Sequence, residues 1–189
     1  VLIEAYGIGH GGSGRNVGLV NAGLWLPPDY IVSRIGKKDG ERLITSLSSA
    51  PQDVFNLVNS YQIQCNAVQN GTLHCAHSIS GFEDLIHRHS QWKALGAPVD
   101  LLGAQETQNL IGTTLYYGAL WDHRAGTIQP LAYCRGLARA AVAQGAKIYE
   151  HSPILSVRKN QDLWQAVTQH GSVTAPKILF CTNAYQDNI

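Results

Sequence analysis

The sequence of 189 residues is 44% hydrophobic and 14% charged, a balance typical of a packed globular core and not of a disordered chain. Its formal charge of +1 excludes the strongly basic surface that nucleic-acid-binding proteins present. No apolar run approaches the roughly 18 residues that a membrane-spanning helix needs.

The four cysteines, at positions 65, 75, 134 and 181, follow neither the spacing of a zinc site nor that of a small disulfide scaffold. The histidines also lack the spacing of a metal-binding motif. We therefore expect reduced cysteines, a cytoplasmic protein and no metal site.

Hydrophobic periodicity and turn residues predict the secondary structure in chain order. A strand at 1–5 leads into a glycine-rich loop at 7–14, and a short helix is expected at 16–25. Between 40 and 62 the pattern predicts two helices divided by Pro51. The remaining predicted elements are strands at 71–77, 99–103, 113–121, 146–150, 154–159, 163–169 and 177–181, and helices at 81–95, 105–110 and 131–144.

The loop GHGGSG carries the G-x-G-x-x-G pattern of dinucleotide-binding folds in Gly9, Gly11 and Gly14. A nicotinamide-dependent dehydrogenase would use this loop for the pyrophosphate and would need an acid about 20 residues later, at the end of the next strand. The segment 30–35 supplies no such acid. The alternative interpretation places the acid before the loop, where the Glu4 carboxylate would accept hydrogen bonds from a ribose diol.

Three segments resemble the FAD-dependent amine and D-amino-acid oxidase superfamily, which includes glycine, sarcosine and γ-glutamylputrescine oxidases. IEAYGIGHGGSGRNVG is similar to the family's E…GxGASGRNxG segment. GALWDHRAGTIQPLAYCRGLARAAVAQGAKIYEHSPILSV is similar to a second block, and APKILFCTNAYQ to a late strand. The resemblance spans residues 1–186, and its first two segments are the more specific.

This resemblance implies an α/β fold, namely an incomplete FAD-binding domain of the glutathione-reductase-like, Rossmann type with an inserted α+β substrate region. Residues 1–35 and 127–189 would form the partial FAD-binding domain, and 36–126 the substrate-domain portion. The sequence contains no methionine and opens with the pattern of a buried strand. We therefore expect an internal fragment of a longer enzyme, without the N-terminal GxGxxG unit and the C-terminal part.

FAD is the cofactor that the resemblance implies, and its contacts fall on three segments. The matching residues are Glu4 for the adenosine ribose; Ser13, Gly14, Arg15 and Asn16 for the phosphates and ribityl chain; Ile154 for the adenine; and Thr182, Asn183 and Ala184 for the pyrophosphate. Asn183 stands where the family usually has glycine, and asparagine tolerates a positive φ.

The substrate side is less defined, and the sequence identifies no catalytic residue. Tyr116 and Tyr117 lie on a predicted strand that could floor a substrate pocket, and only one of them can face it. Arg124 could bind a substrate carboxylate, or it could pair with Asp122.

The function implied is oxidation of a C–N bond of a small amine or amino acid to an imine, with oxygen as the acceptor. The alternative is a truncated, inactive fragment that does not hold FAD. Exposed edges of an incomplete sheet would favour a homo-oligomer.

Overall fold

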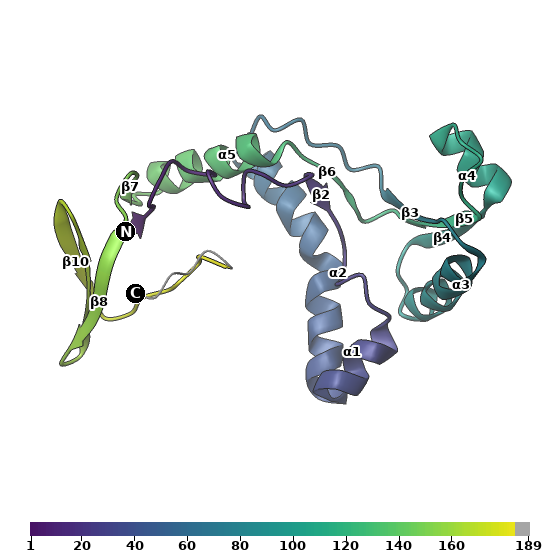
Figure 1. Ribbon diagram of the computed structural model, residues 1–189, viewed down its shortest axis with the longest axis horizontal. Coiled ribbons are helices and arrows are strands. Elements are labelled where there is room, and N and C mark those ends of the chain that lie inside the picture. Colours follow the sequence, from purple (N-terminus) through teal and green to yellow (C-terminus); the bar gives the residue numbers. More distant parts are fainter. Residues whose placement is uncertain (184–189) are drawn as a thin grey trace. The chain divides into compact units, whose positions relative to one another are not determined.

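The computed structural model describes residues 1–183 and divides the chain into two compact units (Figure 1). One unit joins Val1–Asn16 to the segment that begins at Pro130, and the other is Val17–Gln129. We call them the flanking unit and the inserted unit, because the second interrupts the first in the sequence. Within the described residues, no helix combines the length and the apolar character that crossing a membrane requires.

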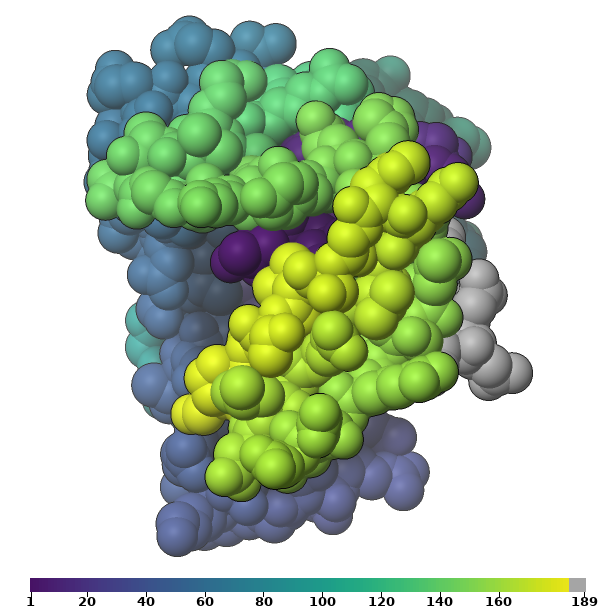
Figure 2. Space-filling view, turned by 90° about the vertical axis from the view of Figure 1, so that its left-hand side faces the viewer, coloured from purple at the N-terminus to yellow at the C-terminus, as the bar shows by residue number. Residues whose placement is uncertain are grey.

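The flanking unit contains a two-stranded parallel sheet, a three-stranded antiparallel sheet and one long helix. Its elements are β1 (Leu2–Ile3), α5 (Pro130–Ala143), β7 (Ile148–Tyr149), β8 (Ile154–Asn160), β9 (Leu163–Thr168) and β10 (Gly171–Ala175). β1 pairs in parallel with β7, so Leu2 lies opposite Ile148. β9 lies between β8 and β10, and Figure 2 shows these strands side by side in yellow-green and yellow. The helix begins at a proline, whose missing N–H is harmless in a first turn.

The inserted unit is built on an antiparallel sheet in which β5 lies between β3 and β4. Its elements are β2 (Leu19–Val20), α1 (Pro28–Ile35), α2 (Lys37–Ser60), β3 (Thr72–Ala76), α3 (Ile79–Ala94), β4 (Val99–Gly103), α4 (Ala104–Ile111), β5 (Gly118–Asp122) and β6 (Gly126–Thr127). Leu120 of β5 packs in one core with Leu85 and Trp92 of α3. The side-chain hydroxyl of Ser78 caps α3 by accepting from the Gly81 N–H at 3.1 Å.

The predicted helix at 16–25 is wrong. Leu19–Val20 forms β2, which pairs antiparallel with β6. Gly18 and Gly23 adopt φ values of +76° and +80°, which an α-helix does not contain.

The predicted break at Pro51 is also wrong, because α2 continues from Lys37 to Ser60 with Pro51 buried inside it. A proline cannot donate to the carbonyl four residues earlier, which here belongs to Leu47. The N–H of Gly23 donates to that carbonyl instead, at 3.4 Å. The polar group that Pro51 leaves unpaired is therefore satisfied from another segment.

Two predicted strands differ from the structure as well. Residues 177–181 form no strand, and Leu179 is 85% exposed, because β-forming side chains need a neighbouring strand with which to pair. The strand predicted at 113–121 begins only at Gly118, so Tyr116 and Tyr117 lie in the preceding loop and not on a strand.

The boundaries of the two units differ from those of the predicted domains. The chain passes between units at 16/17 and at 129/130. The resemblance placed the changes at 35/36 and 126/127. Because the units are defined by packing alone, the assignment of an FAD-binding part and a substrate part stays a prediction.

Candidate functional site

The first candidate site begins at Glu4, directly after β1. Its N–H donates to the carbonyl of Tyr149 at 2.9 Å, which continues the parallel pairing by one residue. The side chain is half-buried, and its Oε1 accepts from the N–H of Tyr6 at 3.0 Å. Glu4 therefore places a carboxylate at the carboxyl end of a parallel strand, where open α/β sheets bind their ligands.

The glycine-rich loop that follows folds back on itself. The N–H groups of Gly14 and Arg15 both donate to the carbonyl of Gly11 at 3.2 Å. The side-chain amide of Asn16 donates to the carbonyls of Gly12 and Ser13, at 2.9 and 3.1 Å. Asn16 thus fixes the loop from within, while the side chains of Ser13 and Arg15 are exposed.

Gly14 has a steric role in this loop. A Cβ at Gly14 would collide with the carbonyl of Gly9 and would lie 2.9 Å from Leu131 Cδ1 on α5. Gly9 approaches the same leucine and has a φ of +78°. The G-x-G-x-x-G pattern is therefore explained in part by the close packing of the loop against itself and against α5.

Glu150 is a site residue that sequence reasoning missed. It follows β7, and its Oε1 accepts from the N–H of Ile8 at 2.6 Å. The next residue, His151, donates its N–H to the carbonyl of Tyr6 at 2.8 Å. The available signal was that both parallel strands, β1 and β7, are followed by a glutamate.

Three loop amides are free to bind a ligand. Within residues 1–183, no protein oxygen accepts from the N–H groups of Gly11, Gly12 or Ser13. Successive free N–H groups in a turn form a concave site for an anion. Beneath the loop, burial and then the charge of Glu4 raise the pKa of Cys134, which keeps this side chain a neutral thiol.

The other residues predicted to contact the cofactor lie elsewhere in the flanking unit. Ile154 opens β8, is half-buried and pairs with Thr168 of β9. Asn183 adopts a φ of +49°, the left-handed conformation expected for it, and Thr182 precedes it. Ala184 lies outside the described residues. The structure records no hydrogen bond from Ile154, Thr182 or Asn183 to the glycine-rich loop, within the part of the chain that it describes.

The predicted substrate residues belong to the inserted unit and do not converge. Tyr117 precedes β5 and donates its N–H to the carbonyl of Ala76 at 2.9 Å. Arg124 follows the other end of β5, and the extended strand separates it from Tyr117 by more than about 15 Å. Tyr116 is half-buried beside Tyr117.

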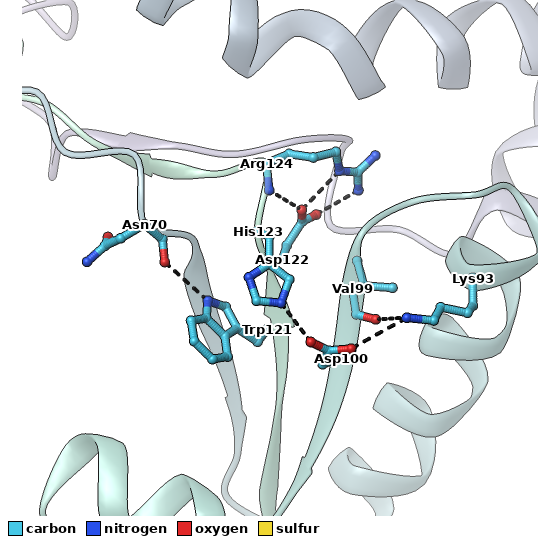
Figure 3. Close-up of polar contacts among 8 residues, drawn as sticks. All are labelled: Asn70, Lys93, Val99, Asp100, Trp121, Asp122, His123 and Arg124. Atoms are coloured by element: carbon cyan, nitrogen blue, oxygen red, sulfur yellow. Dashed lines mark hydrogen bonds and ion pairs between the residues drawn. The ribbon is translucent and has the colours of Figure 1, made fainter.

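Arg124 forms a structural ion pair with Asp122 (Figure 3). Its Nε donates to Asp122 Oδ1 at 2.9 Å, and its Nη2 donates to Oδ2 at 2.6 Å. A further bond from Nη1 reaches Ser48 Oγ at 3.1 Å, and the guanidinium lies 4.9 Å from the Trp92 ring centre. Both charged side chains are less than a fifth exposed, so this guanidinium is already neutralised and largely bonded.

Comparisons with known proteins identify related sequences over the whole chain. The chain is 30% identical to gamma-glutamylputrescine oxidoreductase of Escherichia coli, over 98% of this chain and 43% of that protein. It is 26% identical to the probable oxidoreductase OrdL of Haemophilus influenzae, over 99% of this chain and 44% of the relative. The chain therefore spans less than half the length of these curated relatives.

The solved structures show the same fold. Glycine oxidase from Geobacillus kaustophilus superposes with a TM-score of 0.75 at 20% identity, over 92% of this chain and 46% of that one. This match confirms the predicted α/β fold of the FAD-binding type. A family model described as FAD dependent oxidoreductase (DAO) matches residues 1–189. The resemblance found in the sequence is thus confirmed, and the chain belongs to the FAD dependent oxidoreductase (DAO) family.

Proposed function

We propose that the chain forms part of an enzyme that uses FAD to oxidise a C–N bond of a small amine or amino acid to an imine, with oxygen as the acceptor. The observation that carries the proposal is the site after β1, where the Glu4 carboxylate is followed by a loop with three amides that no other residue of 1–183 bonds. The family match and the relatives named for amine or amino-acid substrates support it. They also support FAD over a nicotinamide cofactor.

The residues present fit the ribose and phosphate part of FAD. Glu4 would accept hydrogen bonds from the ribose hydroxyls, since one carboxylate oxygen bonds Tyr6 and the group is only half-buried. The free N–H groups of the loop would bind phosphate oxygens, and the exposed Ser13 and Arg15 would add a hydroxyl and a positive charge. When bound, the flavin supplies the chemistry by accepting a hydride from the carbon beside the nitrogen.

Asn16, Gly14 and Glu150 would act by positioning. Asn16 holds two loop carbonyls in place, and Glu150 holds the amide of Ile8. Gly14 permits the close packing of the loop. Ile154, Thr182 and Asn183 remain proposed cofactor contacts, and Tyr116, Tyr117 and Arg124 remain proposed substrate contacts. A cytoplasmic location and a homo-oligomer also remain proposals.

The first experiment is a visible absorption spectrum of the purified protein together with its intact mass. Flavin bands at about 370 and 450 nm, followed by peroxide release with amines or amino acids, would support the proposal. A protein that stays colourless after addition of FAD would overturn it in favour of an inactive chain.

A matched pair of variants tests the site itself. Glu4→Gln keeps an oxygen that can accept from Tyr6 but removes the negative charge offered to the ribose. We expect FAD to bind about tenfold more weakly, because a charge-assisted hydrogen bond is lost. Glu83→Gln makes the same change at an exposed position of α3, and FAD affinity should change little. An equal loss of FAD affinity in the two variants would contradict the assignment of Glu4 to the ribose.

A further inference from the structure

A small pocket lies inside the inserted unit, to which the glycine-rich loop does not belong. It has a volume of about 40 Å³ and lies between the segment 21–26, β3, β5 and α3. One water needs about 10–15 Å³ of such volume, so the pocket holds roughly three or four water-sized groups, enough for the three heavy atoms of a carboxylate. Trp25 and Trp92 are among the side chains that line it.

Arg88 and His74 both line this pocket, and both carry hydrogen-bond donors. Arg88 Nε donates to Asp84 Oδ2 at 2.8 Å, and Arg88 Nη1 lies 3.4 Å from His74 Nδ1. Arginine only donates, so His74 Nδ1 accepts and the ring proton is on Nε2. Burial, and then the charge of Arg88, lower the pKa of His74, while Asp84 opposes this shift. A neutral His74 therefore presents its Nε2–H as a donor.

Asn21 presents a third donor. Thr72 Oγ1 donates to Asn21 Oδ1 at 2.9 Å, which fixes the amide and turns its nitrogen away from Thr72. Among residues 1–183, the structure shows no acceptor for Asn21 Nδ2, Arg88 Nη2 or His74 Nε2. Asn21, His74 and Arg88 all line one pocket, and each carries a donor group that has no partner among the described residues.

The two carboxylates near the pocket are already paired. Asp122, which lines it, is bonded through both oxygens to Arg124, as Figure 3 shows. Asp84 is paired with Arg88. The pocket therefore offers free donors without an unpaired negative charge, and a ligand that accepts hydrogen bonds matches it.

We propose that this pocket binds the carboxylate group of a small organic acid, with Arg88, His74 and Asn21 as donors and the two tryptophans as apolar walls. Trp25 contacts His74 edge to face, with ring centres 4.6 Å apart, and is held at a φ of +61°, an unfavourable conformation for a tryptophan. All of these groups belong to the inserted unit. The proposal is therefore independent of FAD and of the proposed oxidation.

The test uses ¹³C-labelled acetate as the probe and the line width of its NMR signal in the presence of the purified chain. We expect broadening by the wild-type protein that unlabelled formate reverses and chloride does not. Asn21→Asp replaces a donor by a carboxylate of nearly the same shape and should weaken acetate binding at least about tenfold. Arg88→Gln should do the same.

The control is Arg34→Gln, which removes an exposed arginine at the end of α1 and should leave acetate binding unchanged. Asn21→Asp keeps the test decisive if Arg88→Gln disturbs the fold. Absence of broadening with the wild-type chain would overturn the proposal. Equal broadening by wild-type and Asn21→Asp would overturn it too, as would equal competition by chloride.

Discussion

The carbonyl oxygen of Leu47, inside α2, accepts a hydrogen bond from the N–H of Gly23 at 3.4 Å. Pro51 creates this opportunity, because it has no N–H to offer the carbonyl four residues before it. Gly23 reaches the helix at a φ of +80° and close to Trp92. A proline in one segment is thereby matched to a glycine in another.

Gly23→Ala should lower the free energy of unfolding by about 1–3 kcal/mol. The new Cβ would lie 3.2 Å from Trp92 Cζ2, and the alanine backbone would have to adopt a left-handed conformation. The control is Gly96→Ala, at a φ of +76° with no atom within 4 Å of the added carbon. Urea unfolding of both variants separates backbone strain from the tryptophan contact, and equal losses would show that the contact does not matter.

Asp122→Asn should destabilise the chain by about 2–4 kcal/mol, because it leaves the largely buried Arg124 without its counter-charge. Asp39→Asn removes the partner of Arg42 in an exposed pair at 3.5 Å and should change stability by no more than about 0.5 kcal/mol. Urea unfolding compares the two. If Asp122→Asn instead left stability intact and altered only substrate affinity, Arg124 would be a substrate residue and not a structural one.

Gly14→Ala should cost about 2 kcal/mol of stability, since the added Cβ would strike the Gly9 carbonyl and Leu131. Gly7→Ala, in the same loop, meets only Glu150 Oε1 at an ordinary 3.6 Å and should be tolerated. The unfolding temperature and the retention of FAD should fall together for Gly14→Ala. If Gly14→Ala kept both its stability and its FAD, the loop would have more room than its hydrogen bonds suggest.

His74 should make stability depend on pH. Its folded-state pKa lies below the ordinary value of 6.5, because the ring is partly buried and then because Arg88 is close. As the pH falls below about 6.5, the unfolded chain takes up this proton first. The stability contributed by neutral His74 is therefore fully present above that pH and is lost as the pH falls toward the folded-state pKa.

His74→Gln removes this titration and keeps an oxygen that can accept from Arg88. We expect urea unfolding of the variant to vary less with pH than that of the wild type in the window below about 6.5. The exposed His170→Gln serves as the control. An unchanged pH dependence in His74→Gln would contradict the prediction.

Elements with a strong local signal were predictable from the sequence. α3 and α5 have helical periodicity and end near a glycine, and the meander β8–β10 alternates and is divided by turn residues. The continuation of α2 through Pro51 was not predictable, because it depends on a hydrogen bond from Gly23, which is distant in sequence. Residues 177–181 show the opposite case, since strong β propensity produced no strand.

The candidate site was predictable where sequence neighbours build it. Glu4 and the loop to Asn16 follow one another along the chain and lie together in the structure. Glu150 was missed because its contact with Ile8 joins residues that are 142 positions apart in the sequence. The pairing of Arg124 with Asp122 is a contact between near neighbours, and sequence alone left it open against substrate binding.

The pairing of β1 with β7 also has a consequence for the order of folding. It joins Leu2 to Ile148, which are far apart in the sequence, so forming it first would require closure of a very long loop. The inserted unit brings its own ends together, because Ile128 donates to the carbonyl of Gly18 at 2.9 Å. Once this bond has formed, the remaining loop is about fourfold shorter, and its closure entropy is reduced by about 1 kcal/mol.

We therefore expect the inserted unit to fold before β1 pairs with β7. Pulse-labelling hydrogen exchange during refolding should show the Ile128 amide protected earlier than the Leu2 amide, which donates to Lys147. Earlier protection of Leu2 would reverse the order. Folding of the inserted unit, which interrupts the flanking unit in the sequence, would then bring the two parts of the flanking unit close enough to assemble quickly.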